Sequence, residues 1–537
     1  MKKLSERNIK WASRMANHWR GYKIFLNNRF FVFMLLILAQ LIFFIGLAVL
    51  LAYNTQMGVI IQIIVWVMGL LSVLYLINKN DRPSVKLSWI VLMLVVPIVG
   101  VPTYLIFGEG RPTRWMYNRL EKAQKENQKA FEEVFGAVEE NLPQERSQGI
   151  CHYLAKYGRF SLYREGELTY YKNGESAFPD ILAELEKAEK YILLDYFIVE
   201  HGKFWNSVLE ILLKKAEQGV QVRMIYDDFG CMLTLPTHYE KRLEALSPNI
   251  RCMAFNRVVP FLVMRMNNRD HRKIMVIDGK VGFTGGINLA DEYIAEKERF
   301  GYWKDSVLRV KGSAVNALTK MFFNFWNAFR GDKEDLKKYL IKKGNEVPMY
   351  ALSDKNLPYI QPYDDCPLDD ISVGETVYLD ILQRAQKYAY IFTPYLILDD
   401  QMRMALCQAA MRGVDVRIVT PGIPDKRIIF RVTRANYDIL RRAGVKIYEY
   451  TPGFIHAKSI VSDDVCAVVG TINFDYRSLY HHFENAVYFA NCDTVLEVKR
   501  DAEETFAVSK LCEHGYPKRS LLGRLLDSLL RVFETLF

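Results

Sequence analysis

The feature that most constrains the fold of this chain is a motif that occurs twice, 185 positions apart. The first copy reads His271-Arg-Lys-Ile-Met-Val-Ile-Asp278, and the second reads His456-Ala-Lys-Ser-Ile-Val-Ser-Asp463. Both fit His-x-Lys-x4-Asp, and in both an asparagine follows the histidine by 17 residues, at Asn288 and Asn473. One short motif is weak evidence, but two copies with the same trailing asparagine indicate a duplicated unit.

Strand and helix patterns alternate from about residue 148 and repeat around the two motifs. The segments 187–191 and 218–223 recur as 384–388 and 412–417. Alternation of this kind predicts a parallel or mixed sheet with helices packed on it. We therefore predict an α/β fold made of two duplicated lobes related by a pseudo-twofold axis. The predicted lobes cover 148–345 and 346–515.

Residues 1–110 predict an α-helical membrane region. No charged residue occurs in 30–52 or in 57–77, and each run has the roughly twenty residues that cross a bilayer. A cleaved signal peptide is disfavoured because the first run is too long and a second follows at once. A third apolar stretch, 87–107, contains two prolines and a glycine, so it is either a kinked span or a re-entrant or interfacial hairpin.

Positive charges flank all three apolar stretches. Because positively charged loops are retained in the cytoplasm, two runs should cross, the third should not, and the large domain should face the cytoplasm from a bacterial plasma membrane. If the third run also crosses, the domain lies outside. The eight cysteines include no Cys-x-x-Cys pair, which is typical of reduced core residues in a cytosol-facing domain.

Two further helical segments flank the lobes. Residues 111–147 form a charged pattern without an apolar face wide enough for a core, which predicts a helical linker. Residues 516–537 place leucines and other apolar residues on one side of a helix. Such an amphipathic helix either packs against the domain or lies on the bilayer.

The formal net charge of +10 is compatible with nucleic acid or with anionic lipid as a partner. The basic segments lie beside the expected membrane runs, which favours anionic lipid headgroups. The sequence therefore predicts an integral membrane protein with lipid partners and no nucleic acid.

The residue types of the two motifs suit an enzyme that acts on a phosphodiester. One imidazole can attack phosphorus while the other protonates the leaving oxygen, and a second alcohol then resolves the phosphohistidine. This chemistry requires neither a metal nor a cofactor. Cationic and neutral donors can stabilise the charge on the non-bridging phosphate oxygens. The candidate donors are Lys273, Lys458, Asn288 and Asn473.

A histidine nucleophile needs an acceptor at its far ring nitrogen. Asp305 and Glu484 lie 34 and 28 residues beyond the two motif histidines, where a following strand could return them. We predict that these carboxylates orient the imidazoles. Four other residues lie near the motifs. His481 and His482 could line the site, although such a pair is more often a solvated strand end, and Tyr196 and Tyr395 are expected in the core rather than at a ligand.

The paired motifs, each with a trailing Gly-x-x-Asn, resemble those of the phospholipase D superfamily. Within it, longer segments resemble bacterial cardiolipin synthases: Asn268-Arg-Asp-His-Arg-Lys-Ile-Met-Val-Ile-Asp-Gly279, Thr284-Gly-Gly-Ile-Asn-Leu-Ala-Asp-Glu-Tyr293, Tyr226-Asp-Asp-Phe-Gly230 and Thr393-Pro-Tyr395. The resemblance implies two phospholipase D-like lobes sharing one active site. It also implies transfer of a phosphatidyl group from one phosphatidylglycerol to another, with release of glycerol and without a metal.

The same resemblance implies roles for the members of the two catalytic motifs. His271 attacks phosphorus and His456 is the acid, although the residues alone do not distinguish the two. The motif aspartates, Asp278 and Asp463, are implied to be structural.

Other functions remain compatible with the motifs. Water could resolve the intermediate, as in a phospholipase D or a nuclease, although the membrane runs disfavour a nuclease. A different acceptor, such as phosphatidylethanolamine or a free polyol, would also fit. A non-catalytic membrane scaffold would have no reason to keep both reactive sets complete.

Overall fold

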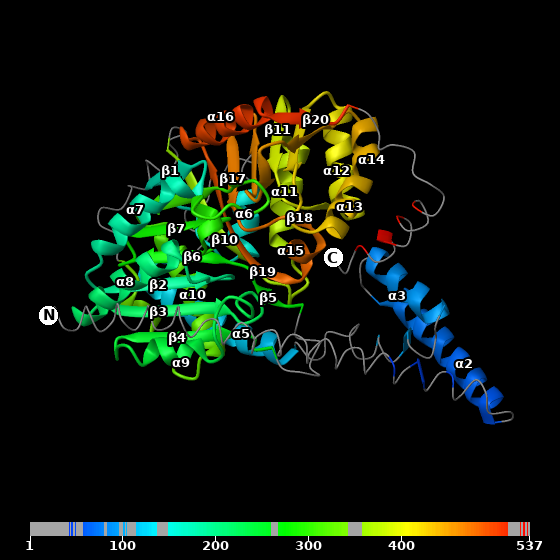
Figure 1. Ribbon diagram of the computed structural model, residues 1–537, viewed down its shortest axis with the longest axis horizontal. Helices are drawn as coiled ribbons and strands as arrows, with labels where there is room; N and C mark the ends of the chain where they lie inside the picture. The colour runs from blue at the N-terminus through cyan, green and yellow to red at the C-terminus, as the bar shows by residue number, and fades with distance from the viewer. Residues whose placement is uncertain are drawn as a thin grey trace.

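The computed structural model describes two lobes that lie side by side, each built on one mixed β-sheet (Figure 1). The described residues are 57–79, 83–95, 114–136, 149–258, 267–341 and 357–513, with isolated positions in 42–49, 100–104 and 523–534.

The first sheet has seven strands in the order β1-β9-β7-β6-β2-β3-β4. Strands β2, β3 and β4, at one end of this sheet, are parallel, and the remaining pairs are antiparallel. The bounds are β1 (Glu167–Tyr171), β2 (Tyr191–Tyr196), β3 (Gln221–Asp227), β4 (Ile250–Phe255), β6 (Lys273–Ile277), β7 (Val281–Gly285) and β9 (Val307–Lys311). Its helices are α7 (Gly174–Glu186), α8 (Lys203–Glu217), α9 (Tyr239–Glu244) and α10 (Val315–Phe329).

The second sheet repeats this order as β10-β19-β17-β16-β11-β13-β14, followed by β20. Its strands are β10 (Tyr359–Asp365), β11 (Tyr388–Phe392), β13 (Asp415–Pro421), β14 (Lys446–Tyr450), β16 (Ser459–Ser462), β17 (Cys466–Gly470), β19 (His482–Ala490) and β20 (Ser509–Leu511). Its helices are α11 (Val373–Arg384), α12 (Asp400–Met411), α13 (Arg427–Ala435), α14 (Tyr437–Arg442), α15 (Tyr476–Tyr480) and α16 (Thr494–Ala507). The predicted duplicated α/β fold is therefore confirmed.

The central strands are apolar on both faces because helices cover both sides of each sheet. In β2, Ile192 and Leu194 face the cluster that contains α7 and α8, whereas Leu193 faces the cluster that contains α10. Helix α10 is buried along almost its whole length and packs against β6 of the first sheet and β10 of the second. One hydrophobic core therefore continues from lobe to lobe through α10.

The segment predicted to be a linker instead packs on this central helix. Helix α5 (Arg114–Phe135) buries the stripe Met116, Leu120, Ala123, Asn127 and Phe131. Its Asn127 side chain exchanges hydrogen bonds with Asn324 and Asn327 of α10, at 3.0 and 3.1 Å. The expectation of a helix without a core-facing side is wrong because small and amide side chains complete a face that apolar residues alone leave too narrow.

The described part of the N-terminal region contains α2 (Met57–Asn78) and α3 (Pro83–Val95). Val73 and Leu76 of α2 share a buried cluster with Met93, Val101 and Tyr104, all from the predicted third apolar stretch. The predicted run 30–52 lies outside the described residues except for isolated positions.

Within the part of the chain that the structure describes, no helix has both the length and the apolarity required to cross a bilayer.

The described positions of the C-terminal segment lie against α13. Arg431 of α13 donates hydrogen bonds to the Asp527 carboxylate and to the Gly523 carbonyl. Leu530 packs on a small cluster that contains Val432 of α13. At these positions the segment packs on the domain, one of the two alternatives predicted for 516–537.

The motif aspartates each hold the start of a neighbouring strand. The Asp278 carboxylate accepts hydrogen bonds of 2.8 Å from the backbone N–H groups of Glu189, Lys190 and Tyr191, where β2 begins. Asp463 does the same where β11 begins, at 386–388. Both aspartates thus tie the motif strand to its neighbour, which is the structural role that the family resemblance implies.

Replacing Asp278 with alanine should destabilise the first lobe. The substitution leaves three backbone donors without their charged acceptor, so we expect the free energy of unfolding to fall by about 2–4 kcal/mol. Denaturant unfolding of the purified protein measures this loss. Lys280→Ala, in the same turn but with a side chain 61% exposed, is the control and should unfold like the wild type. Equal stability of Asp278→Ala and the control would contradict this role.

Candidate active site

Two short strand pairs cross from one lobe to the other. Strand β5 (Arg269–Asp270) pairs in parallel with the start of β19, with Asp270 opposite Phe483. Strand β15 (Gly453–Ile455) pairs in parallel with β8 (Tyr302–Lys304), with Ile455 opposite Lys304. The next residue of each crossing strand is a motif histidine. The backbone N–H of His271 donates to the Phe483 carbonyl at 2.9 Å, and that of His456 donates to the Lys304 carbonyl at 2.7 Å.

This register brings each motif histidine to a carboxylate of the other lobe. Nδ1 of His271 lies 2.9 Å from both carboxylate oxygens of Glu484, and Nδ1 of His456 lies 2.6 Å from Oδ2 of Asp305. Both carboxylates are fully buried. The two predicted partners are therefore brought to the histidines, but the expectation that each returns to the histidine of its own lobe is wrong. Each of these two imidazole–carboxylate pairs therefore takes one residue from each lobe.

The buried environment keeps both imidazoles neutral near pH 7. Burial, together with Lys458, lowers the pKa of His456 to about 4, although Asp305 opposes the shift. Burial and the cations around it, Lys273 first, hold the pKa of His271 well below its usual value. Burial would raise the pKa of Asp305, but His456 and Lys458 outweigh it and keep this carboxyl ionised. A neutral imidazole has a free lone pair on one ring nitrogen, as a nucleophile requires.

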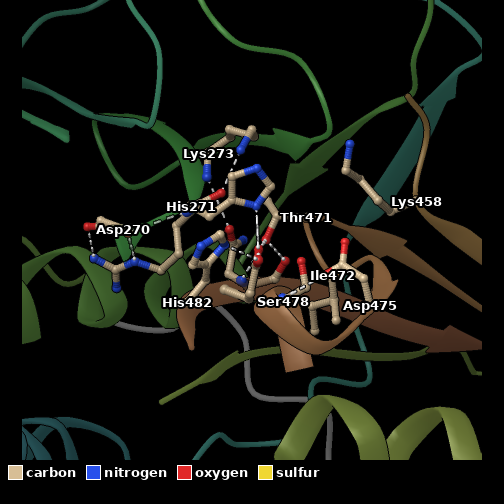
Figure 2. Close-up of polar contacts among 12 residues, drawn as sticks. Asp270, His271, Lys273, Lys458, Thr471, Ile472, Asp475, Ser478 and His482 are labelled. Carbon is tan, nitrogen blue, oxygen red and sulfur yellow. Dashed lines mark hydrogen bonds and ion pairs between the residues drawn. The ribbon is translucent and has the colours of Figure 1, made fainter. Parts of the chain in front are cut away.

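The motif lysines lie beside the histidines and are almost completely buried. Lys273 Nζ donates to the His271 carbonyl at 2.6 Å, and Lys458 Nζ lies 2.8 Å from Nδ1 of His456. Burial lowers the pKa of Lys273 to about 7 and that of Lys458 to about 8. Both lysines interact electrostatically with Glu484 and with Asp305, so the two half-sites form one charged centre. Figure 2 shows Lys273 beside His271 and Lys458 across the site.

The two motif asparagines are placed differently. Asn288 accepts from the backbone N–H of Ile198 at 3.0 Å and donates to the Tyr293 hydroxyl at 2.7 Å, so both ends of its amide are engaged. It thereby holds the Tyr293 ring, which lies 5.6 Å from the His456 ring. Asn473 is 6% exposed, and its amide oxygen has no hydrogen-bond partner among the described residues. Phosphate binding by Asn288 and Asn473 remains a prediction.

Several residues of the site carry no motif signal in the sequence. The Thr471 hydroxyl donates to the Glu484 carboxylate, and Asn485 accepts from the Lys273 backbone N–H at 3.2 Å. Four aromatic rings surround the imidazoles: Phe197 near His271, and Tyr293, Trp303 and Phe454 near His456. Two hints were present in the sequence: Thr471 follows the glycine of the second Gly-x-x-Asn, and Tyr293 ends one of the segments that carry the family resemblance.

The structure also locates the residues near the motifs that were interpreted as core or as a strand end. Tyr196 is buried in β2 and Tyr395 packs against the same hydrophobic cluster, as expected for core residues, and the Tyr395 hydroxyl donates to Asp425. His482 is not a solvated strand end, because its ring lies 5.5 Å from that of His271. Among the described residues, His271, His482 and Glu484 offer possible metal-ligand atoms within 4.8 Å of one another. Catalysis without a metal remains a prediction.

Comparison with known proteins places most of the chain in one family. The profile of the family described as "Cardiolipin synthase, PLD-like domain" matches residues 181–326 and 378–506, and that described as "Phospholipase D-nuclease N-terminal" matches 64–109. The chain is 32% identical to a cardiolipin synthase of Alkalihalophilus pseudofirmus, over 88% of this chain and 94% of the relative. It is 33% identical to a cardiolipin synthase of Geobacillus kaustophilus, over 85% and 90%.

A solved structure has the same fold. The phosphatidylserine synthase of Haemophilus influenzae superposes with a TM-score of 0.55 at 14% identity, covering 73% of this chain and all of that one. At this level of identity the likeness concerns the fold alone.

Replacing either crossing carboxyl group with its amide should slow turnover of a phosphodiester substrate. In Glu484→Gln and Asp305→Asn the shape is kept, but the acceptor that fixes the imidazole tautomer is lost, so we expect kcat to fall by about 10²–10⁴-fold. Steady-state kinetics of the purified variants measures the loss. Glu497→Gln, on α16, serves as the matched control and should keep the wild-type rate. Full activity of both carboxylate variants would contradict the orienting role.

Proposed function

This chain belongs to the family of cardiolipin synthases with phospholipase D-like domains, and from that premise we propose that it transfers a phosphatidyl group between two phosphatidylglycerol molecules. The products are cardiolipin and glycerol. The observation that carries the proposal is the pair of buried imidazoles, each bonded through Nδ1 to a carboxylate of the opposite lobe. Both Nε2 atoms then remain for chemistry on a single phosphate.

In the first step, Nε2 of His271 attacks the phosphorus of one phosphatidylglycerol. The bond from phosphorus to the glycerol oxygen breaks, and His456 gives that oxygen a proton. In the second step, the hydroxyl of another phosphatidylglycerol gives its proton to His456 and attacks phosphorus. The phosphorus–nitrogen bond breaks, cardiolipin leaves, and both imidazoles return to their starting states.

The lysines act on the charge of the phosphate. Lys273 and Lys458 offer ammonium groups that balance the negative charge as phosphorus becomes five-coordinate. In the free protein burial, together with Lys458, lowers the pKa of His456 and keeps this imidazole neutral. A phosphodiester anion between the lysines offsets their effect, so His456 takes up the proton that it later donates when substrate binds.

Two alternatives concern what resolves the intermediate. Water would make the protein a phospholipase D-type hydrolase, and another alcohol would give a different phospholipid. Aromatic rings surround both imidazoles, and His271 and His456 are only 7% and 8% exposed. A site that is this shielded from water favours a lipid alcohol over water as the group that resolves the intermediate.

The membrane arrangement is part of the same proposal. Runs 30–52 and 57–77 cross the bacterial plasma membrane, stretch 87–107 does not, and the two lobes face the cytoplasm. Protease protection in right-side-out vesicles tests this topology, because cytoplasmic lobes stay intact until the vesicles are opened.

Incubation of the purified protein with phosphatidylglycerol tests the reaction. We expect cardiolipin and glycerol in equal amounts, and none of either from His271→Ala. Phosphatidic acid as the sole lipid product would identify a hydrolase. Adding phosphatidylethanolamine or a free polyol in competition identifies the preferred acceptor.

The roles of the two histidines can be separated with a substrate that needs no acid. A lipid phosphodiester with a p-nitrophenol leaving group should label wild type and His456→Ala through an acid-labile phosphohistidine, but not His271→Ala. His456→Ala should retain the label longest, because no base then activates the acceptor. Labelling of His271→Ala together with its absence in His456→Ala would reverse the assignment.

The lysine pKa values predict an alkaline limit to activity. As pH rises through about 7 and then about 8, Lys273 and Lys458 lose the charges that bind phosphate, so kcat/KM should fall above pH 8. Bound substrate anion raises both lysine pKa values, so kcat should fall at higher pH than kcat/KM. Profiles in vesicles from pH 5 to 10 measure both limits. A kcat/KM that stays flat to pH 10 would contradict the assignment.

A further inference from the structure

The pseudo-twofold symmetry places His482 and Trp303 at equivalent positions. Each lies two residues before the carboxylate that pairs with a motif histidine, within a crossing strand pair. The Trp303 ring lies 5.3 Å from the His456 ring at an interplanar angle of 45°. The His482 ring lies 5.5 Å from the His271 ring at 44°. One half-site therefore carries an indole where the other carries an imidazole.

This difference gives the His271 half-site a third group that can bind a metal. An indole has only a donor N–H, whereas an imidazole has a nitrogen lone pair. Nδ1 of His482 is buried and has no hydrogen-bond partner among the described residues. It lies 3.7 Å from Oε1 of Glu484, longer than a hydrogen bond but close to the separation of two ligands on one ion.

The distances fit a tetrahedral transition metal. Zinc binds histidine nitrogen and carboxylate oxygen at about 2.0–2.1 Å, which places tetrahedral ligand atoms about 3.3 Å apart. The separations here are 2.9 Å from His271 Nδ1 to either Glu484 oxygen and 3.7 Å from His482 Nδ1 to Oε1. These two separations lie on either side of that value, and the three ligand atoms lie within 4.8 Å of one another, so side-chain movements would bring all three to one ion. Figure 2 shows His482 and His271 on the same side of the site.

We propose that His271, His482 and Glu484 form an inhibitory site for Zn²⁺ or a similar transition metal. The metal takes the place of the proton shared between His271 and Glu484, and its fourth position stays open. The reacting imidazole is then fixed as a metal ligand and its carboxylate is engaged, so transfer stops. Two histidines and one carboxylate select zinc-like ions over Mg²⁺ and Ca²⁺, which require mostly oxygen ligands.

The surrounding charges make this site a reversible one. Lys273 lies beside His271, and Arg269 and Arg477 act electrostatically on His482. These cations disfavour a bound metal ion, and burial raises the pKa of Glu484 well above its usual value, so the metal must also displace a proton from that carboxyl group. A resident structural metal would need a more negative site, so occupancy follows the supply of free metal.

Metal binding can be tested without any lipid. We expect the purified full-length protein to bind Co²⁺ with visible d–d bands that lack the strong near-ultraviolet bands of cysteine ligation. His482→Gln should lose one equivalent of this binding, and His482→Trp, which copies the other half-site, should lose it as well. His238→Gln, whose side chain is 56% exposed, is the matched control and should keep it. Unchanged Co²⁺ spectra in both His482 variants would overturn the proposal.

Inhibition of phosphatidyl transfer by the metal is the second test, and only this test rests on the proposed function. With each protein normalised to its own metal-free rate, micromolar Zn²⁺ should inhibit the wild type and His238→Gln, and a chelator should reverse this. The His482 variants should need at least tenfold more Zn²⁺ for half inhibition. Equal sensitivity of all proteins would overturn the inhibitory role. A protein that makes no cardiolipin but binds Co²⁺ through His482 would refute the proposed function alone.

Discussion

The active site depends on two short parallel strand pairs that each join one lobe to the other. In both, backbone hydrogen bonds fix the register by which a motif histidine meets a carboxylate across the interface. The distance between imidazole and carboxylate is therefore set by backbone geometry, which varies far less than the rotamers of long side chains. In this arrangement, an intact site forms only when both lobes are folded and docked against each other.

A buried charge cluster anchors one of these strand pairs. Arg272, between the histidine and lysine of the first motif, is fully buried and bonds Asp270 of β5 and Asp195 of β2 at 2.8–3.0 Å. Its guanidinium lies 3.5 Å over the Phe325 ring of α10, and Asp364 approaches from the second lobe. Leaving such a charge without its partners would cost about 3–5 kcal/mol, so the cluster strongly favours the docked arrangement.

The two half-sites share a backbone plan but differ in side chains. Ala457 stands where the first motif has Arg272, and Thr471 stands where the first lobe has Gly286. At Gly286 a Cβ atom would lie 1.8 Å from Asp305 Oδ1, so glycine is needed for that carboxylate to approach. The Thr471 hydroxyl instead bonds Glu484. Differences of this kind allow two symmetry-related imidazoles to take different parts in one reaction.

The sequence by itself determined the duplication, the mixed α/β lobes and the motif residues, because spacing and apolar periodicity are local and repeat in both halves. It also named Asp305 and Glu484 as carboxylate partners. Only the tertiary structure decided that these partners cross between lobes, that α5 packs on α10 through Asn127, and that His482 lies beside His271. Those contacts join residues about 150–210 positions apart, and no local pattern encodes which surfaces of two similar lobes will meet.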